Sequence, residues 1–454
     1  MTLLRVFGAA VAAVTLALAV PARARAQERD SIPGVTLGLV YETLFTPALA
    51  IRPFGGRFGG ETSANPVEAI VARDLRNSDR FQVMDSLPPA MTGERIDYPL
   101  WDRLGAVWLL TGQVEAQGDR STLLLELHDV VYGRLKESGR FPLPNPEAPD
   151  FRMAVHRASD EVVRWIAGEP GMAASRIAFS MVAPGTQNKE LYLIDADGEN
   201  LHRLTNHASI VLSPAWSPDG SRLAFSSYKT GVPRIYIREM ATGSERMVSE
   251  RAFQTGDHMT PAWAPDGVTL AFAVTSGERS GIFTYNVQRN CCLTHLTGGR
   301  WNDISPAYAP DGRTLAFNSN RLGTGQPQVY VMPAGGGDPD LISPYAYDRP
   351  GYFTAPDWSP VGDLVAFHGA IRRGTYHILV ARIEDRGRRV RQLTWEGNNE
   401  DPSWAPDGRH IVFKGERRWG KGLFVVDVAT GVTRTILTGV DITVPEWSPA
   451  LPAR

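Results

Sequence analysis

The stretch Ser213-Pro-Ala-Trp-Ser-Pro-Asp-Gly220 decides the fold, because its two prolines flanking an aromatic residue recur five more times along the chain. The other copies begin at Thr260, Ser305, Ala355, Asp401 and Val444. The second prolines of successive copies lie 47, 45, 50, 46 and 43 residues apart. A period of roughly 40 to 50 residues is typical of the four-stranded blades of a β-propeller. The sequence therefore predicts six blades.

Each copy leads into a tight turn. In Pro-Asp-Gly, proline presets φ at the first corner, aspartate tolerates the second, and glycine accepts the positive φ of the exit. The runs that follow, such as Leu223-Ala-Phe225, predict short buried strands. A third strand such as Ile235-Tyr-Ile237 and a fourth ending like Leu204-Thr205 complete the unit. Each repeat therefore predicts one four-stranded sheet.

The two ends of the array complement each other. The first unit begins at Ile177-Ala-Phe179 without a proline phrase before it, whereas the last phrase, Val444 to Pro449, has no strands after it. We therefore expect the C-terminal strand to be the innermost strand of the first blade, which would remove the free edges of an open array. The aromatic position of the phrase is expected to pack between blades, with the hydroxyl of its one tyrosine on a polar neighbour. Its occupants are Trp216, Trp263, Tyr308, Trp358, Trp404 and Trp447.

Residues 1–26 are predicted to be a secretory signal peptide. Arg5 supplies the charged start, Val6 to Val20 form an apolar run, and Ala24-Arg25-Ala26 is a small-residue cleavage site. The apolar run is only about 15 residues long, and a membrane-spanning helix needs roughly 20. We therefore expect the mature chain to begin at Gln27.

Residues 27–168 predict an α/β domain, with a mixed sheet and helices, that precedes a propeller at residues 172–454. Helical spacing of apolar residues runs from Asn65-Pro66 to Leu75 and again from Phe151 to Ile166. Gly168-Glu-Pro-Gly171 ends the second helix and is expected to mark the domain boundary. The predicted strands of this domain are Val35 to Tyr41, Ala48 to Ile51, Phe81 to Met84, and a hairpin of Ala106 to Glu115 with Ser121 to Val131.

Cys291 and Cys292 are the two cysteines of the chain. Adjacent Cα atoms lie about 3.8 Å apart, short of the usual disulfide range of roughly 4.4 to 6.8 Å. We expect a pair of small strand residues, with a strained vicinal disulfide as the alternative.

Signatures of catalysis and metal binding are absent from the sequence. There is no G-x-S-x-G, H-E-x-x-H or C-x-x-C pattern, and the nine histidines are scattered. The formal net charge of −2 also makes nucleic acid an unexpected partner. We therefore predict a protein that is not an enzyme and has no catalytic residues, metal or cofactor.

The combination of signal peptide, α/β domain and six-unit propeller resembles the TolB family of the Tol-Pal system. The resemblance is carried by Ile70 to Phe81, Leu109 to Val114, Ala158 to Val162 and Pro445 to Pro449. It implies a monomeric periplasmic adaptor that binds the peptidoglycan-associated lipoprotein (Pal) through the propeller and TolA through its N-terminus. Outer-membrane integrity, cell division and protein import are the processes implied. The segment in the place of the TolA-binding stretch is Gln27 to Tyr41, with Val35, Leu37, Leu39 and Tyr41 as candidate contacts.

The loops that enter the innermost strands open on one rim of the channel, so their polar residues are presented together. They predict a partner-binding rim, and ordinary polar loops are the alternative. We hypothesise that three of the rim residues, His258, Asp303 and Asp401, contact the lipoprotein; His258 stands where the family has a rim histidine. The full set is Gln254, His258, Asn302, Asp303, Ser305, Asn399, Glu400, Asp401, Asp441 and Thr443. Other readings are a periplasmic propeller sensor or hydrolase-like protein that binds a small ligand in the channel, and an export-linked scaffold.

Overall fold

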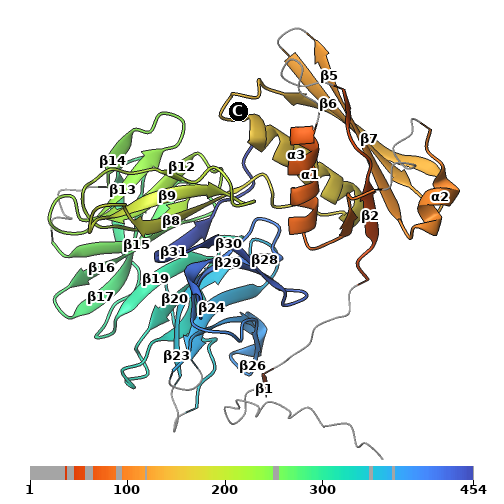
Figure 1. The fold of residues 1–454 in the computed structure, drawn as a ribbon. Helices are drawn as coiled ribbons and strands as arrows, with labels where there is room; N and C mark the ends of the chain where they lie inside the picture. The colour runs from red at the N-terminus through yellow and green to blue at the C-terminus, as the bar shows by residue number, and fades with distance from the viewer. Residues whose placement is uncertain are drawn as a thin grey trace, which may run out of the picture.

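The computed structural model describes residues 36–37, 45–56, 65–87, 95–117, 120–248, 255–346, 351–370 and 374–452. The predicted signal peptide lies outside these ranges. Figure 1 shows an N-terminal sheet covered by helices beside a ring of radiating sheets. Across the described ranges, no helix is long and apolar enough to span a bilayer.

The N-terminal domain has a mixed sheet of strand order β4-β2-β5-β6-β7, with β3 paired to β5. β2 runs parallel to both β4 and β5, whereas β5, β6 and β7 are antiparallel. The expected mixed α/β fold is thus confirmed, including the hairpin at Ala106 to Val131. The strands are β2 (Ala48–Ile51), β3 (Gly55–Gly56), β4 (Gln82–Met84), β5 (Trp108–Gln117), β6 (Arg120–Asp129) and β7 (Arg134–Leu143), and the helices are α1 (Asn65–Asn77), α2 (Tyr98–Arg103) and α3 (Phe151–Ala167).

Helices α1 and α3 bury their predicted apolar stripes against this sheet. Val71 and Leu75 of α1 and Val155 and Val162 of α3 are fully buried in the same cluster as Leu125 of β6. Sequence analysis missed α2, whose N-cap Asp97 accepts a hydrogen bond from the Leu100 amide. Helix α3 ends at Ala167 and the next strand begins at Arg176; a domain boundary at residues 168 to 172 stays our proposal.

The remaining strands form six blades, each named here from its innermost strand outward. Blade 1 contains β31 (Ile442–Trp447), β8 (Arg176–Val182), β9 (Lys189–Asp195) and β10 (His202–Arg203), and blade 2 contains β11 (Val211–Trp216), β12 (Arg222–Ser227), β13 (Arg234–Glu239) and β14 (Glu245–Met247). Blade 3 contains β15 (Asp257–Trp263), β16 (Thr269–Ser276), β17 (Arg279–Asn286) and β18 (Cys291–His295), and blade 4 contains β19 (Asp303–Tyr308), β20 (Thr314–Ser319), β21 (Gln328–Pro333) and β22 (Asp340–Leu341). Blade 5 contains β23 (Tyr352–Trp358), β24 (Leu364–Ala370), β25 (His377–Arg382), the short helix η3 (Ile383–Asp385) and β26 (Arg389–Gln392), and blade 6 contains β27 (Asn399–Trp404), β28 (His410–Arg417), β29 (Gly420–Asp427) and β30 (Thr433–Thr438).

The ring closes by strand exchange, as the sequence predicted. β31 pairs antiparallel with β8, placing Trp447 opposite Ile177. The chain then continues along the start of the first blade, where the Ser448 amide donates to the Arg176 carbonyl over 2.8 Å and the Leu451 amide donates to the Ala174 carbonyl over 2.8 Å. The two ends of the array are therefore joined by one continuous backbone ladder.

A β-bulge interrupts every innermost strand immediately before the first proline of the phrase. The strand register shifts at each of these sites. Non-glycine residues seldom adopt positive φ, and β-branched ones least of all. The six residues, which share φ values from 49° to 55°, are Ser213, Thr260, Ser305, Ala355, Asp401 and Val444.

The aromatic residues of the phrase pack between blades, which confirms that prediction. Trp263 of blade 3 is buried in one cluster with Ile235 of blade 2 and donates its indole N–H to the blade 2 carbonyl of Ala215 over 3.1 Å. The indole of Trp404 reaches the Asp357 carbonyl of blade 5 in the same way, over 3.2 Å. At the tyrosine position, burial raises the pKa of Tyr308, and the Asp266 carboxylate raises it further.

The N-terminal domain contacts blade 6 through Asp79, which has φ 53° just after α1. Its Oδ2 lies 3.1 Å from His410 Nε2 and 3.0 Å from Arg434 Nη1, and its carbonyl accepts from Arg409 over 2.9 Å. Burial alone would lower the pKa of His410, but the Asp407 and Asp79 carboxylates outweigh burial and raise it.

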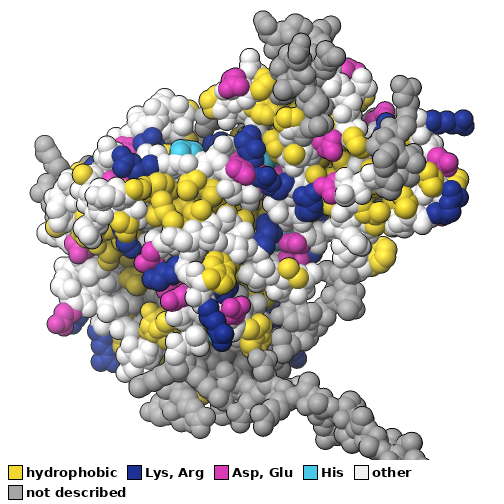
Figure 2. All heavy atoms as spheres, viewed as in Figure 1, with side chains coloured by type: hydrophobic (Ala, Val, Ile, Leu, Met, Phe, Trp, Pro, Cys, Tyr) yellow, Lys and Arg dark blue, Asp and Glu magenta, His cyan; other side chains and the backbone are white. Residues whose placement is uncertain are grey.

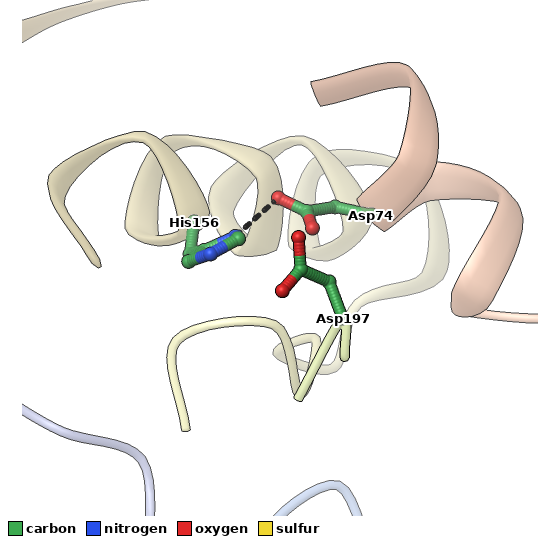
Figure 3. A group of neighbouring side chains, drawn as sticks. All are labelled: Asp74, His156 and Asp197. Atoms are coloured by element: carbon green, nitrogen blue, oxygen red, sulfur yellow. Dashed lines mark hydrogen bonds and ion pairs between the residues drawn. The ribbon is translucent and has the colours of Figure 1, made fainter. Parts of the chain in front are cut away.

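A second polar contact joins α1 and α3 to the β9–β10 turn of blade 1. Arg152 and Arg73 both pair with Asp197, and His156 Nδ1 lies 2.8 Å from Asp74 Oδ2 (Figure 3). On the face of the molecule in Figure 2, basic and acidic side chains are interspersed across both domains. Ion pairs therefore join the two domains at both of these contacts.

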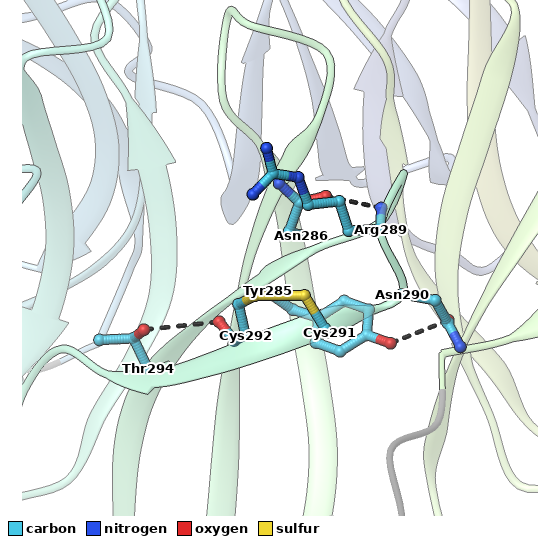
Figure 4. The surroundings of a disulfide bond; sticks show 7 residues. All are labelled: Tyr285, Asn286, Arg289, Asn290, Cys291, Cys292 and Thr294. Carbon is cyan, nitrogen blue, oxygen red and sulfur yellow. Dashed lines mark hydrogen bonds between the residues drawn. A yellow bond between two sulfur atoms is a disulfide. The ribbon is translucent and has the colours of Figure 1, made fainter.

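Cys291 and Cys292 form a disulfide bond (Figure 4), so the expectation of two unlinked strand residues is wrong and the vicinal alternative holds. The bond lies at the start of β18, the outermost strand of blade 3. There Cys292 takes φ 67°, in the left-handed region.

Deleting residues 444–454 removes most of β31 and leaves β8 unpaired on its inner edge. We expect aggregation or a large loss of thermal stability, because an open array exposes free strand edges. Light scattering and thermal unfolding of the truncated and full chains test this. A truncated protein as stable as the full chain would rule out closure as the source of stability.

Asp79→Asn should weaken the contact between the domains by roughly 1–3 kcal/mol, because buried His410 and half-buried Arg434 lose their charged partner. A raised histidine pKa stabilises the fold below the unfolded pKa of about 6.5, and that contribution is lost as pH rises through the folded value. The cost of the substitution should therefore shrink with rising pH in urea unfolding. Asp85→Asn, which breaks the more exposed pair with Arg76, is the control; equal costs in both variants at every pH would contradict the role of Asp79.

Candidate functional site

The central channel is lined by the proline phrases of the innermost strands. It encloses a cavity of ≈ 190 Å³ bounded by residues from all six blades, among them Ser213, Thr260, Ser305, Asp401 and Glu446. Each innermost strand runs from an entry loop to a Pro-Asp-Gly type turn, so these loops and turns lie at opposite ends of the channel. The N-terminal domain contacts the turn end, since Asp79 bonds Arg409 and His410 just after the last turn. The predicted rim is therefore on the face away from the N-terminal domain.

The structure buries three of the predicted rim residues. His258 and Asp303 are each 1% exposed and Asn399 is fully buried. Asp303 pairs with Arg321 over 3.1 Å, and the Asn399 side chain accepts from Arg417 and bonds the Tyr376 and Gly397 carbonyls. In this structure both side chains lie beneath the surface of the rim, and their contact with a partner stays a prediction. Burial, helped by the positive charge of Arg234, lowers the pKa of His258 to about 4, so its ring is neutral at pH 7.

The other predicted rim residues reach the solvent. Glu400 and Asp401 are partly exposed, with 28% and 19% of their side chains accessible. Asp441 is the most exposed carboxylate of the set, and Asn302 is also exposed, whereas Ser305 and Thr443 are half-buried. Gln254 lies outside the described residues.

A chain of hydrogen bonds crosses blades 5, 6 and 1 at the mouth of the channel. The Asp401 amide donates to His368 Nδ1 of blade 5 over 3.0 Å, and its carboxylate accepts from the Val444 amide of blade 1 over 3.2 Å. Next to it, Lys189 reaches the Thr443 hydroxyl over 3.5 Å. The polar side chains of three blades are thus held in one connected arrangement.

Two carboxyl groups inside the channel were missed by sequence analysis. The residue between proline and the aromatic position is alanine in blades 2, 3 and 4 but Asp357, Ser403 and Glu446 in blades 5, 6 and 1. Burial raises the pKa of Asp357 to about 6. Burial and the Asp357 carboxylate together raise the pKa of Glu446 well above its ordinary value. The signal was present in the aligned phrases, where these positions break the alanine pattern.

Two groups of described residues have the composition of a metal site: Asp74, His156 and Asp197, and Asp79, His410 and Asp427. Arginines already occupy their carboxylates, since Arg152 pairs with Asp197 and Arg409 with Asp427. A divalent cation would have to displace these positive side chains. The geometry of both groups therefore suits ion pairing between domains better than metal binding.

Of the predicted N-terminal contacts, Leu37 alone lies in the described residues. It belongs to β1 (Thr36–Leu37), which pairs in parallel with Arg389 and Val390 of β26. Val35, Leu39 and Tyr41 lie outside the described residues. Thr36 and Leu37 thus lie along the outer edge of blade 5.

Family models match both parts of the chain. A model described as the TolB beta propeller domain matches residues 163–451, and one described as the TolB amino-terminal domain matches residues 43–136. Tol-Pal system protein TolB of Methylococcus capsulatus is 32% identical over 209 residues, covering 44% of this chain and 47% of that protein. The same protein of Cereibacter sphaeroides is 34% identical over 247 residues, covering 53% and 54%. The chain thus matches about half the length of these curated relatives.

A solved structure has the same fold. The crystal structure of TolB from Acinetobacter baumannii superposes with a TM-score of 0.76 and 24% identity, over 89% of this chain and 97% of that one. At this identity the likeness establishes the architecture alone.

Glu446→Gln should raise the melting temperature at pH 8 and leave it unchanged at pH 4. The reason is that a carboxyl with a raised folded pKa carries no penalty below its unfolded pKa of about 4.3, but destabilises the fold as pH rises toward the folded value. Thermal unfolding at the two pH values tests this, with Glu384→Gln, whose side chain is 71% exposed, as control. An equal shift at both pH values would show that the effect is not titration of Glu446.

Proposed function

Because the chain belongs to the TolB family, we propose that it is a non-enzymatic periplasmic adaptor of the Tol-Pal envelope system. In this role its propeller rim binds the peptidoglycan-associated lipoprotein and its N-terminal segment binds TolA. The observation that carries the proposal is the polar rim on the face that the N-terminal domain leaves open, where hydrogen bonds through Asp401 link blades 5, 6 and 1.

The exposed rim residues are the proposed contacts. Glu400 and Asp441 already pair with Lys414 and Lys421 over 3.5 and 3.2 Å. Such pairs at a rim contribute little to stability, so their members are available to a partner's polar groups at small cost. The proposed set comes from blades 4, 6 and 1: Asn302, Ser305, Glu400, Asp401, Asp441 and Thr443.

The N-terminal segment is proposed to exchange between the propeller edge and TolA. In the part of this segment that the structure describes, Thr36 and Leu37 pair with β26. A partner that takes up this segment as a strand would replace this pairing with its own.

A small-molecule sensor is the second candidate, because the channel encloses a cavity beside two carboxyl groups. Its volume of ≈ 190 Å³ is below the roughly 300–1,000 Å³ of typical ligand pockets. The cavity therefore favours the adaptor over a channel that binds a drug-sized ligand.

Glu400→Ala and Asp401→Asn should each weaken binding of the purified lipoprotein domain by roughly 1–3 kcal/mol, because each removes or neutralises a charged acceptor at the rim. Calorimetric titration measures the affinity, and thermal unfolding checks that the variants stay folded. Asp311→Ala is the matched control, because Asp311 is an exposed aspartate in the Pro-Asp-Gly turn of blade 4. Unaltered affinity in both rim variants, or an equal loss in the control, would move the site elsewhere.

A further inference from the structure

The disulfide of Cys291 and Cys292 closes a ring of only two residues. Cross-links stabilise mainly by restricting the unfolded chain, and the restriction is least for the shortest loops. β18 is already held by pairing of Cys291 with Asn286, Thr294 with Thr284 and His295 with Phe283. The bond is therefore poorly suited to act as a structural staple.

The bond instead creates a local irregularity in the outer strand of blade 3. Between the paired positions, Cys292 and Leu293 together stand opposite Tyr285, which makes a β-bulge. Asn290 and Cys292 both have positive φ, 53° and 67°. The adjacent Cα atoms are 3.8 Å apart, less than the roughly 4.4–6.8 Å of ordinary disulfides. Adjacency thus imposes an uncommon backbone on this strand.

The two cysteines differ in exposure. Cys292 is exposed, whereas Cys291 is half-buried. The preceding turn, with Gln288 and Asn290, borders an open groove of ≈ 870 Å³ between blades 2 and 3. Cys292 is therefore the cysteine that an incoming thiol would reach first, and the groove beside the preceding turn could receive the molecule that carries the thiol.

We propose that Cys291–Cys292 is a site of thiol–disulfide exchange that accepts two electrons from a dithiol while the propeller stays folded. A thiolate of the dithiol attacks Sγ of Cys292, and the electron pair of the broken S–S bond goes to Sγ of Cys291, which takes a proton. In the mixed disulfide, the first sulfur of the dithiol is bonded to Sγ of Cys292. The second thiolate of the dithiol attacks that first sulfur, and Cys292 leaves as a thiolate and is protonated. The dithiol ends as a disulfide and the protein as two thiols, so two electrons and two protons are transferred.

Reduction frees the strand from the constraint that holds Cys292 at positive φ. The bulge opposite Tyr285 then relaxes, and with it the turn that carries Asn290, whose side chain accepts from the Tyr285 hydroxyl over 2.8 Å (Figure 4). The inner strands of blade 3 keep their pairing, because β16 and β17 are joined along their whole length.

The exchange is tested on the full chain in buffers of graded reduced to oxidised dithiothreitol, with alkylation by iodoacetamide and intact-mass analysis. We expect both cysteines to become alkylated under conditions in which circular dichroism and the melting temperature still report a folded protein. The Cys291→Ser/Cys292→Ser variant is the control and should not respond to reductant. A bond that is reduced only when the chain unfolds, or two free thiols in the untreated exported protein, would overturn the proposal.

Two further measurements locate the chemistry. With glutathione and iodoacetamide together, the trapped product should carry glutathione on Cys292 and the alkyl group on Cys291; the reverse arrangement would refute attack at Cys292. Hydrogen exchange of residues 287–295 should be faster in the reduced protein and in the double serine variant than in the oxidised protein. Identical exchange in all three would refute relaxation of the bulge. The rate of reduction by a protein dithiol of the Cys-x-x-Cys type is compared with the rate by dithiothreitol at the same reduction potential. A faster reaction with the protein dithiol indicates a partner that docks on the propeller, and equal rates indicate exchange with small thiols alone.

Discussion

The pairing of β31 with β8 is the interaction on which the rest of the structure depends. It turns a row of similar sheets into a ring, and only a ring has a channel, a rim and two faces. The residues after β31 extend the seam toward the N-terminal domain, since the Pro452 carbonyl lies 3.4 Å from the Arg157 guanidinium of α3. Asp79 and Asp197 mark the other contacts, on blades 6 and 1. The N-terminal domain is therefore seated across the seam where the ring closes.

The proline phrase shapes each innermost strand in two ways. The Pro-Asp-Gly at the end of the phrase makes the tight turn that follows the strand. The residue before the first proline makes the bulge within the strand, at positive φ. A residue held in such a region costs about 1–3 kcal/mol, so it persists only where surrounding contacts fix it. Here the contacts are between blades: the Ser305 amide donates to the Thr260 hydroxyl and the Val444 amide to the Asp401 carboxylate. The bulges thus link neighbouring blades at the mouth of the channel.

The sequence was sufficient for features that depend on local spacing. Repeats of the proline phrase predicted the blade number and the closure, and helical spacing predicted α1 and α3. Features that depend on distant residues were beyond its reach. Nothing near Asp79 in the sequence indicates that His410 and Arg434 surround it, and the polar character of His258 and Asp303 does not reveal that both are buried. The usual Cα separation argues against a disulfide between neighbours, whereas the structure joins Cys291 and Cys292 with Cys292 at positive φ.

Polarity inside the ring is concentrated on the same blades that meet the rest of the chain. Blades 2, 3 and 4 keep alanine between proline and the aromatic residue, while blades 5, 6 and 1 carry Asp357, Ser403 and Glu446. The cross-blade chain through Asp401 spans these blades at the rim, β1 pairs with blade 5, and Asp79 and Asp197 contact blades 6 and 1. Energetic coupling between distant surfaces can be carried by packed side chains and hydrogen-bond networks. In this propeller such a path is short, because one set of three sheets carries the rim on one face and the N-terminal contacts on the other.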